Sequence, residues 1–304
     1  MKKTTQISQM IRKRCMAAIS QKYEEALREE AVRRLDWELL ALDRTGGECL
    51  LFYIRKLMDK FQLRACDIST RGRWGGSIIV YLMDISEIDP ICYHLSSEFV
   101  FGIEGERDLL PEINIQPDLW EDMMVDVNEL ESVKDIIDMG NVGSFDDHYF
   151  KKKLNSLELI PYKLVDELHR MSEMTGVDIA DVPLDDREVY EFLWEKDGIK
   201  QAGGFEKLPE ELLYGLQEVT EYLKPKNVEE LARVLALTHE PVYWMRIAEK
   251  QVAEKTASFE TLISCREDKD DTEVYLCPKA HAISDAIVHI RLAWYRIHYP
   301  QMGE

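Results

Sequence analysis

The sequence predicts an α+β protein that is mostly helical. Apolar residues recur at three- and four-residue spacings over 7–42, 49–63 and 187–195, which is typical of amphipathic helices. Short segments rich in β-branched and aromatic residues, at 99–103 and 113–115, are typical of strands. A chain of 304 residues that is 45% hydrophobic and 32% charged can bury the core of one large or two small domains.

The first third of the chain predicts two helices followed by a Gly-rich turn. Neither Gly nor Pro interrupts 7–42, and the T-G-G sequence at 45–47 ends this helix before the next, at 49–63. The turn, R-G-R-W-G-G-S at 71–77, precedes the apolar run I-I-V-Y-L at 78–82. This run is compatible with either a helix or a strand.

The remaining two thirds predict further helices. The pattern is helical over 149–175, and a Pro- and Asp-containing loop leads into the helix at 187–195. Another helix opens near residue 227, and the last spans 279–298 before Pro300 ends it. The acidic stretch 118–140 predicts helix and loop. Its acidic run at 118–138 is either a solvated face or a strip that mimics DNA phosphate or binds a partner.

Charge and cysteine content restrict the functional class. The formal net charge is −20, and residues 101–200 carry 26 acidic against 10 basic side chains, which argues against tight non-specific DNA binding. No apolar run approaches a bilayer's thickness and no secretory leader opens the sequence, so we expect a cytoplasmic protein that makes no membrane contact. The cysteines have no C-x-x-C spacing, so we expect free thiols and no zinc. They are Cys15, Cys49, Cys66, Cys92, Cys265 and Cys277.

The Gly-rich turn at 71–77 permits two interpretations. Backbone N–H groups exposed by glycines can cradle a phosphate, and flanking arginines add positive charge. A structural turn would have the same composition. No Gly-Lys-Ser/Thr follows, so this is not a Walker A loop.

The sequence from 71 to 90 resembles the nucleotide-phosphate loop of the bacterial DNA polymerase III alpha subunit in its PolC form. That family reads R-G-S-x-G-S-S and later I-T-x-V-N/D-P. Arg71, Gly72, Gly75 and Ser77 fit, whereas position 73 (Arg), position 74 (Trp) and position 76 (Gly) depart. The resemblance implies contacts with a nucleotide triphosphate from Arg71, Gly72, Arg73, Gly75, Gly76 and Ser77.

Other segments resemble the same family in the same order, among them 175–189, 231–239 and 263–268. The strongest are P-K-A-H-A at 278–282 and R-L-A-W-Y-R-I-H-Y-P at 291–300, which are similar to F-P-K-A-H-A and R-I-A-Y-F-K-V-H-Y/H-P. The resemblance implies that Lys279, His281 and Arg291 face the triphosphate. Read without it, Lys279 is an ordinary solvated lysine, and His281 shares a helix face with His289 in a hydrogen-bonded structural role.

The family's metal-binding carboxylates are altered here. Its P-D-I-D-L motif corresponds to P-E-I-N-I at 111–115, and its F-D-x-H segment to 145–148. The resemblance therefore implies a degenerate catalytic triad of Glu112, Asn114 and Asp146, with L-E-L at 157–159 at the family's spacing to L-D-I. Two acids on alternate residues of a strand point to one face. An amide brings no charge to offset two dications, so we expect weak Mg²⁺ binding, by Glu112 and Asp146, and little catalysis.

The resemblance implies a reduced nucleotidyltransferase-like palm and helical fingers. We expect an N-terminal helical segment at 1–44, the palm-like domain at 45–160 and the fingers-like domain at 161–304. The favoured hypothesis is a catalytically impaired PolC-like protein that binds a deoxynucleotide triphosphate, DNA such as a primer end, or a replisome protein. The alternatives are an active minimal DNA-directed DNA polymerase and a non-catalytic interaction or decoy protein.

Overall fold

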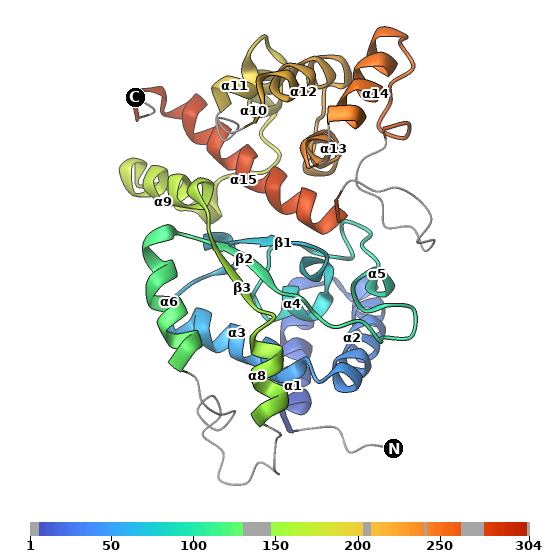
Figure 1. Ribbon diagram of the computed structural model, residues 1–304, viewed down its shortest axis with the longest axis vertical. Coiled ribbons are helices and arrows are strands. Elements are labelled where there is room, and N and C mark those ends of the chain that lie inside the picture. The colour runs from blue at the N-terminus through green and yellow to red at the C-terminus, as the bar shows by residue number, and fades with distance from the viewer. Residues whose placement is uncertain (1–5, 130–146, 203–207, 240–241, 263–276, 303–304) are drawn as a thin grey trace. The chain divides into compact units, whose positions relative to one another are not determined.

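The chain forms two compact units, Met1–Tyr162 and Lys163–Glu304, each described here by itself. The computed structural model describes residues 6–129, 147–202, 208–239, 242–262 and 277–302. The described part is mostly helical with one three-stranded sheet, which confirms the α+β class (Figure 1). The division into three domains at 1–44, 45–160 and 161–304 stays a prediction.

Unit 1 contains the sheet, and all three strands lie within it. Its elements are α1 (Gln6–Lys22), α2 (Glu25–Thr45), α3 (Glu48–Lys60), η1 (Ala65–Asp67), β1 (Ser69–Arg71), η2 (Trp74–Gly76), α4 (Ile78–Leu82), α5 (Ser97–Phe101), β2 (Glu112–Ile115), α6 (Pro117–Glu129), α8 (Asp147–Leu154) and β3 (Glu158–Pro161).

The strand order is β1-β2-β3, with β1 antiparallel and β3 parallel to β2. A parallel pair needs a long crossover, and here the connection from β2 to β3 includes α6 and α8. Side chains alternate along β2: Ile113 and Ile115 belong to the apolar core, so Glu112 and Asn114 lie on the opposite face. The predicted strand at 113–115 is thereby confirmed.

The single helix predicted for 7–42 is wrong, because the chain breaks it after Lys22. Glu24 has an extended backbone, and the Tyr23 hydroxyl donates to Asp89 Oδ1 at 2.7 Å. The break lets α2 fold back on α1, so that the apolar stripes of both helices enter one core. A helical pattern continuous in sequence does not reveal this turn, which is held by the distant Asp89 and by Arg28, whose Nε donates to the Tyr23 carbonyl oxygen at 2.9 Å.

Two further local predictions are corrected. The segment 99–103, expected as a strand, lies mostly in helix α5, where Val100 and Phe101 are fully buried. The helical pattern expected over 149–175 is interrupted by β3, which separates α8 from α9. In both places tertiary contacts override local propensity: β3 forms because β2 offers it a parallel partner.

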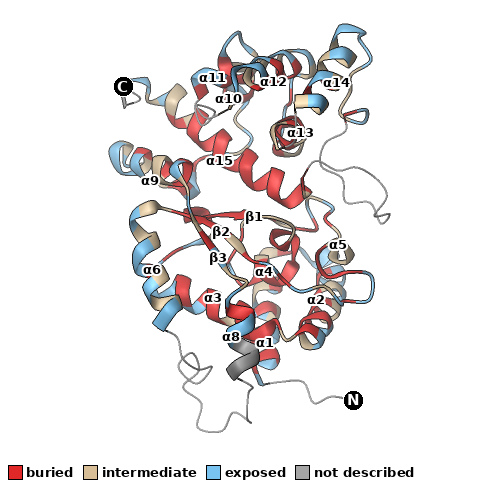
Figure 2. Cartoon of the chain, in the orientation of Figure 1, coloured by how far each residue is buried: buried red, intermediate tan, exposed pale blue. Residues whose placement is uncertain are grey.

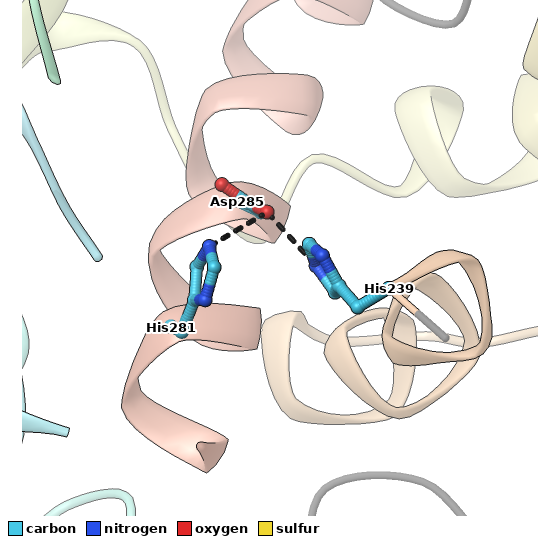
Figure 3. Close-up of side chains that lie close together, drawn as sticks. All are labelled: His239, His281 and Asp285. Carbon is cyan, nitrogen blue, oxygen red and sulfur yellow. Dashed lines mark ion pairs between the residues drawn. The ribbon is translucent and has the colours of Figure 1, made fainter. Parts of the chain in front are cut away.

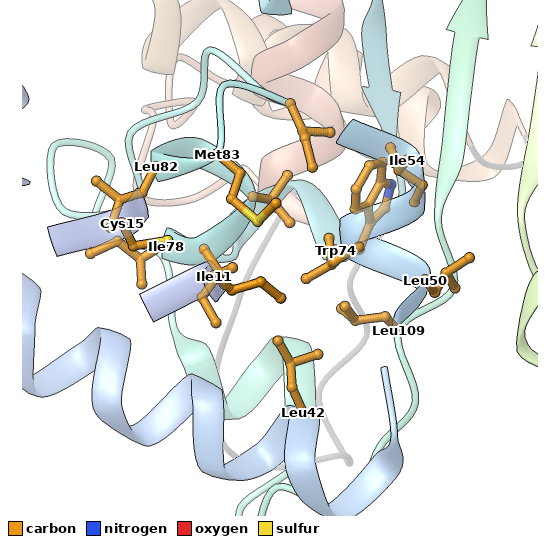
Figure 4. Packing of buried hydrophobic residues seen from close by; sticks show 14 of the residues in the cluster. Ile11, Cys15, Leu42, Leu50, Ile54, Trp74, Ile78, Leu82, Met83 and Leu109 are labelled. Carbon is orange, nitrogen blue, oxygen red and sulfur yellow. The ribbon is translucent and has the colours of Figure 1, made fainter. Parts of the chain in front are cut away.

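The core of unit 1 joins α1, α2, α3 and α4 to one face of the sheet (Figure 1). Figure 4 shows Trp74, which is 0% exposed, in the same cluster of buried side chains as Ile11, Leu42, Leu50 and Ile78. The buried indole ties the Gly-rich turn to the core that the helices share. Removing so large a buried side chain typically costs about 3–5 kcal/mol.

Unit 2 is helical throughout its described residues. The long helix α15 packs against α9 and α13 and is buried along most of its length, whereas α12 packs against α14 (Figure 2). The last helix, predicted at about 279–298, is confirmed. The elements are α9 (Lys163–Thr175), η3 (Ile179–Asp181), α10 (Arg187–Trp194), α11 (Gly198–Ala202), α12 (Glu210–Leu223), α13 (Val228–Leu235), η4 (Ala236–Thr238), α14 (Val242–Ala253), α15 (Lys279–His298) and η5 (Pro300–Met302). None of the helices in the described part of the chain is both long enough and apolar enough to cross a membrane.

Burial separates the thiols by reactivity. Among the cysteines of the described residues, Cys15 and Cys49 are buried and Cys92 is exposed. Burial raises the pKa of Cys15 to about 12 and also raises that of Cys49, so neither is a thiolate at pH 8.

A short iodoacetamide pulse at pH 8, read by peptide mass spectrometry, should therefore label Cys92 and spare Cys15 and Cys49. The same pulse in urea should label all three, and equal labelling of Cys15 and Cys92 in the native protein would contradict this packing.

Candidate functional site

The Gly-rich turn connects β1 to α4 and depends on two of its glycines. Gly72 has φ of +69°, a left-handed conformation that side chains disfavour. A Cβ at Gly75 would lie 2.6 Å from Thr70 Oγ1. These constraints explain the glycines without a ligand, as the structural interpretation of the turn requires.

The two bulky departures from the PolC pattern make contacts within unit 1. Trp74 Nε1 donates to the carbonyl oxygen of Glu112 at 3.1 Å, so the loop is bonded to β2. Arg73 Nε donates to the carbonyl oxygen of Val100 at 3.2 Å, at the end of α5. Both side chains therefore help to hold the turn against its neighbours.

The amides at the start of α4 already bind an anion from within the protein. The carboxylate of Glu38 is 0% exposed. It accepts hydrogen bonds from the Ser77 hydroxyl at 2.5 Å and from the N–H groups of Ile78 and Ile79 at 3.2 and 3.3 Å. It also accepts the Ser97 hydroxyl at 2.6 Å and pairs with Arg34 at 3.1 Å.

Sequence reasoning missed Glu38, although a signal was present. Leu35, Leu39 and Leu42 form the apolar stripe of α2, and Glu38 falls on that same stripe. An acid on a buried helix face needs partners. Here the partners include the Ser77 hydroxyl of the Gly-rich turn and the first two amides of α4, so Ser77 binds a protein carboxylate in this structure.

The sheet brings one cation and two acids into a row. Arg71, Glu112 and Glu158 are register partners on β1, β2 and β3, so their side chains leave the sheet on the same face. Arg71 Nε lies 3.8 Å from Glu112 Oε2, and both side chains are 36% exposed. Glu158, which sequence reasoning did not assign to the site, stands beside Glu112; its L-E-L segment at the family's spacing was the available signal.

The other two members of the predicted triad are Asn114 and Asp146. Asn114 is 1% exposed, and its Nδ2 donates to Ser69 Oγ at 3.3 Å on the neighbouring strand. Its Oδ1 accepts no hydrogen bond from any described residue. Asp146 lies outside the described residues. The structure thus places Glu112 and Asn114 on one face of β2, as the strand alternation predicts.

The residues predicted on unit 2 lie along α15. Lys279 is 9% exposed and its Nζ lies 2.7 Å from Glu229 Oε1, so the solvated-lysine interpretation is wrong. Burial acts to raise the pKa of Glu229, but the hydrogen bond and charge of Lys279 outweigh it and lower that pKa. Arg291 is 3% exposed.

His281 belongs to a cluster that sequence reasoning missed. Its Nε2 lies 3.5 Å from Asp285 Oδ2, and His239 Nε2 lies 3.1 Å from the same oxygen (Figure 3). Burial acts to raise the pKa of Asp285, but the hydrogen bond from His239 and the charges of the nearby histidines lower it to about 2. His289 Nδ1 lies 2.7 Å from the Asp285 carbonyl oxygen, a hydrogen-bonded structural role as expected.

A family model describing the bacterial DNA polymerase III alpha NTPase domain matches residues 9–204, which is more than half of the chain. The chain belongs to this family. The match covers the Gly-rich turn, all three strands and the first helices of unit 2, and Lys279, His281 and Arg291 lie beyond it.

Curated relatives agree with this assignment. The chain is 21% identical over 210 residues to the PolC-type DNA polymerase III of Listeria monocytogenes serovar 1/2a, covering 51% of this chain and 14% of the relative. It is 22% identical over 187 residues to that of Mycoplasma pneumoniae (44% and 13%) and 23% identical over 217 residues to that of Clostridium perfringens (52% and 15%). The matched part of this PolC-like chain thus spans about a seventh of these relatives' length.

The buried Glu38 carboxylate gives a stability prediction. Glu38→Ala removes the acceptor of the Ser77 hydroxyl and the Ile78 N–H and the carboxylate that pairs with Arg34, so we expect a loss of about 3–5 kcal/mol in the free energy of unfolding. Urea denaturation followed by tryptophan fluorescence measures it. The matched control, Glu30→Ala at an exposed position of α2, should leave the midpoint unchanged. Equal midpoints for both variants would show that Glu38 does not anchor the turn.

Proposed function

We propose that this PolC-like chain is catalytically impaired and acts by binding a deoxynucleotide triphosphate, a primer end or another replication component. In this proposal the β1-β2-β3 sheet is a reduced nucleotidyltransferase-like palm, and unit 2 corresponds to the fingers. One observation carries the proposal: Asn114, which is a neutral amide, lies on the same face of β2 as Glu112.

The electrostatics of the sheet support impairment. Two-metal catalysis needs negative charge to hold two dications near the reacting phosphate. Asn114 supplies none, and the Arg71 guanidinium 3.8 Å from Glu112 opposes the approach of a cation to that carboxylate. Positioning and charge supply nearly all phosphoryl-transfer catalysis, so this loss bears directly on the chemistry.

The expected phosphate-binding cations support weak rather than tight nucleotide binding. Arg71 pairs with Glu112, Lys279 with Glu229, and Arg73 with a backbone carbonyl. A triphosphate that binds any one of these cations must compete with its present partner, so part of the binding energy is lost to their separation. The acidic residues 101–200 also disfavour a large DNA contact.

One observation favours a second candidate, an active minimal nucleotidyltransferase. Glu112 and Glu158 are register partners on neighbouring strands, and carboxylates so placed can share one divalent ion. In that case Glu158 takes the place beside Glu112 that the family resemblance assigns to Asp146.

A primer-extension assay separates the two candidates. We expect no extension by the wild type with Mg²⁺ or Mn²⁺, because the site holds too little negative charge. Asn114→Asp restores one charge and should tighten Mn²⁺ binding roughly tenfold or more, measured by calorimetry, whereas Gln21→Glu, on an exposed position of α1, should not. Extension by the wild type that Glu112→Gln abolishes would overturn impairment and establish the second candidate.

Nucleotide binding is tested at Arg71. A hydrogen bond to a charged group contributes about 1.5–3 kcal/mol, so Arg71→Ala should weaken binding of a deoxynucleotide triphosphate by roughly tenfold or more in a calorimetric titration with Mg²⁺. Arg33→Ala removes an exposed cation of α2 and is the matched control, expected to bind as the wild type does. Equal affinities for all three proteins would exclude the Gly-rich turn from nucleotide binding.

A further inference from the structure

Three side chains of unit 2 converge on one point. His281 and Asp285 are four residues apart on α15, so they lie one turn apart on the same face of the helix. His239 follows η4 and reaches the same place from a different segment of the unit. Both imidazoles present Nε2 to the single oxygen Oδ2 of Asp285 (Figure 3).

The distances from Asp285 Oδ2 to the two imidazoles are those of ligands that share a metal ion. Ligand atoms bound at about 2.0–2.1 Å in tetrahedral geometry lie about 3.3 Å from one another. His239 Nε2 and His281 Nε2 lie 3.1 and 3.5 Å from Asp285 Oδ2, and the three ligand atoms all fall within 4.8 Å of one another. An ion can therefore enter with small movements of the side chains.

Charge and burial favour a cation at this point. Asp285 is 7% exposed, and the carboxylate has almost no water to solvate it. When both imidazoles are neutral, the cluster carries one buried negative charge, which is costly without compensation. A divalent ion supplies that compensation, and neutral imidazole with carboxylate is a suitable donor set for it.

We propose that His239, His281 and Asp285 bind one divalent transition-metal ion of the zinc type. Two imidazoles select zinc, cobalt or nickel over magnesium, which prefers oxygen ligands. Three protein ligands leave a fourth position open, and His239, whose side chain is 24% exposed, gives this position access to solvent. The site needs no cysteine, so the cysteine spacing that argued against zinc does not bear on it.

The ion would also have a structural effect. It cross-links the end of η4 to the first turns of α15, two segments far apart in the sequence. An ion that binds only the folded state stabilises that state by mass action. The site lies wholly in unit 2 and uses neither Glu112 nor Asn114, so it stands or falls independently of the function proposed above.

The test uses the full chain, freed of any affinity tag and stripped with a chelator. We expect Zn²⁺ to bind at one equivalent in a competition titration, to raise the melting temperature, and to be displaced by EDTA. Mg²⁺ at the same concentration should neither bind at this site nor raise the melting temperature. His239→Ala, at a partly exposed position, and Asp285→Asn should each weaken Zn²⁺ binding at least tenfold.

The matched control is His298→Ala. His298 Nε2 lies 2.9 Å from Asp186 Oδ2, a histidine–carboxylate pair for which the described residues supply no third metal ligand. This variant should bind Zn²⁺ as the wild type does. Co²⁺ added to the wild type should give the visible absorption of a four-coordinate ion, and His239→Ala should lose it.

Two results would overturn the proposal. One is a stripped wild type that binds no Zn²⁺ and shows no shift in melting temperature. The other is Zn²⁺ binding that His239→Ala and Asp285→Asn leave unchanged while circular dichroism shows both variants folded. In either case the cluster is a hydrogen-bonded structural triad.

Discussion

The buried carboxylate of Glu38 is the contact on which the Gly-rich turn depends. It gathers a hydroxyl and two amides from the start of α4, a hydroxyl from α5 and the guanidinium of Arg34. A charge removed from water is tolerated only when such donors surround it. The end of the Gly-rich turn and the start of α4 are therefore held by α2.

The same principle extends to the residues expected to bind a nucleotide. Arg71 lies beside Glu112, Lys279 beside Glu229, and His281 beside Asp285. In each case a cation or imidazole that was expected to bind a phosphate already lies beside a carboxylate of the same chain. The chain thus keeps a domain of the DNA polymerase III alpha family, while Arg71, Lys279 and His281 each lie beside an acidic side chain of the same chain.

Much of the fold was predictable where one face of a helix decides burial. The helix at 279–298 and the strand at 113–115 are confirmed, because their apolar patterns agree with their final surroundings. Residues 99–103 and the strand at 158–161 were misjudged, because both are fixed by distant partners. At the site, the departure at Asn114 was readable from sequence, whereas the neighbours of Glu112 and His281 were not.

The sequence by itself determined the family, the helical character of the chain and the loss of one acid from the predicted triad. These are properties of residue identity and spacing, which local pattern records. Only the tertiary structure decided that Glu38 fills the start of α4, that Glu158 stands beside Glu112, and that His239 meets Asp285. Each of these pairs joins segments tens of residues apart, and their proximity arises when strands pair and helices pack around a shared core.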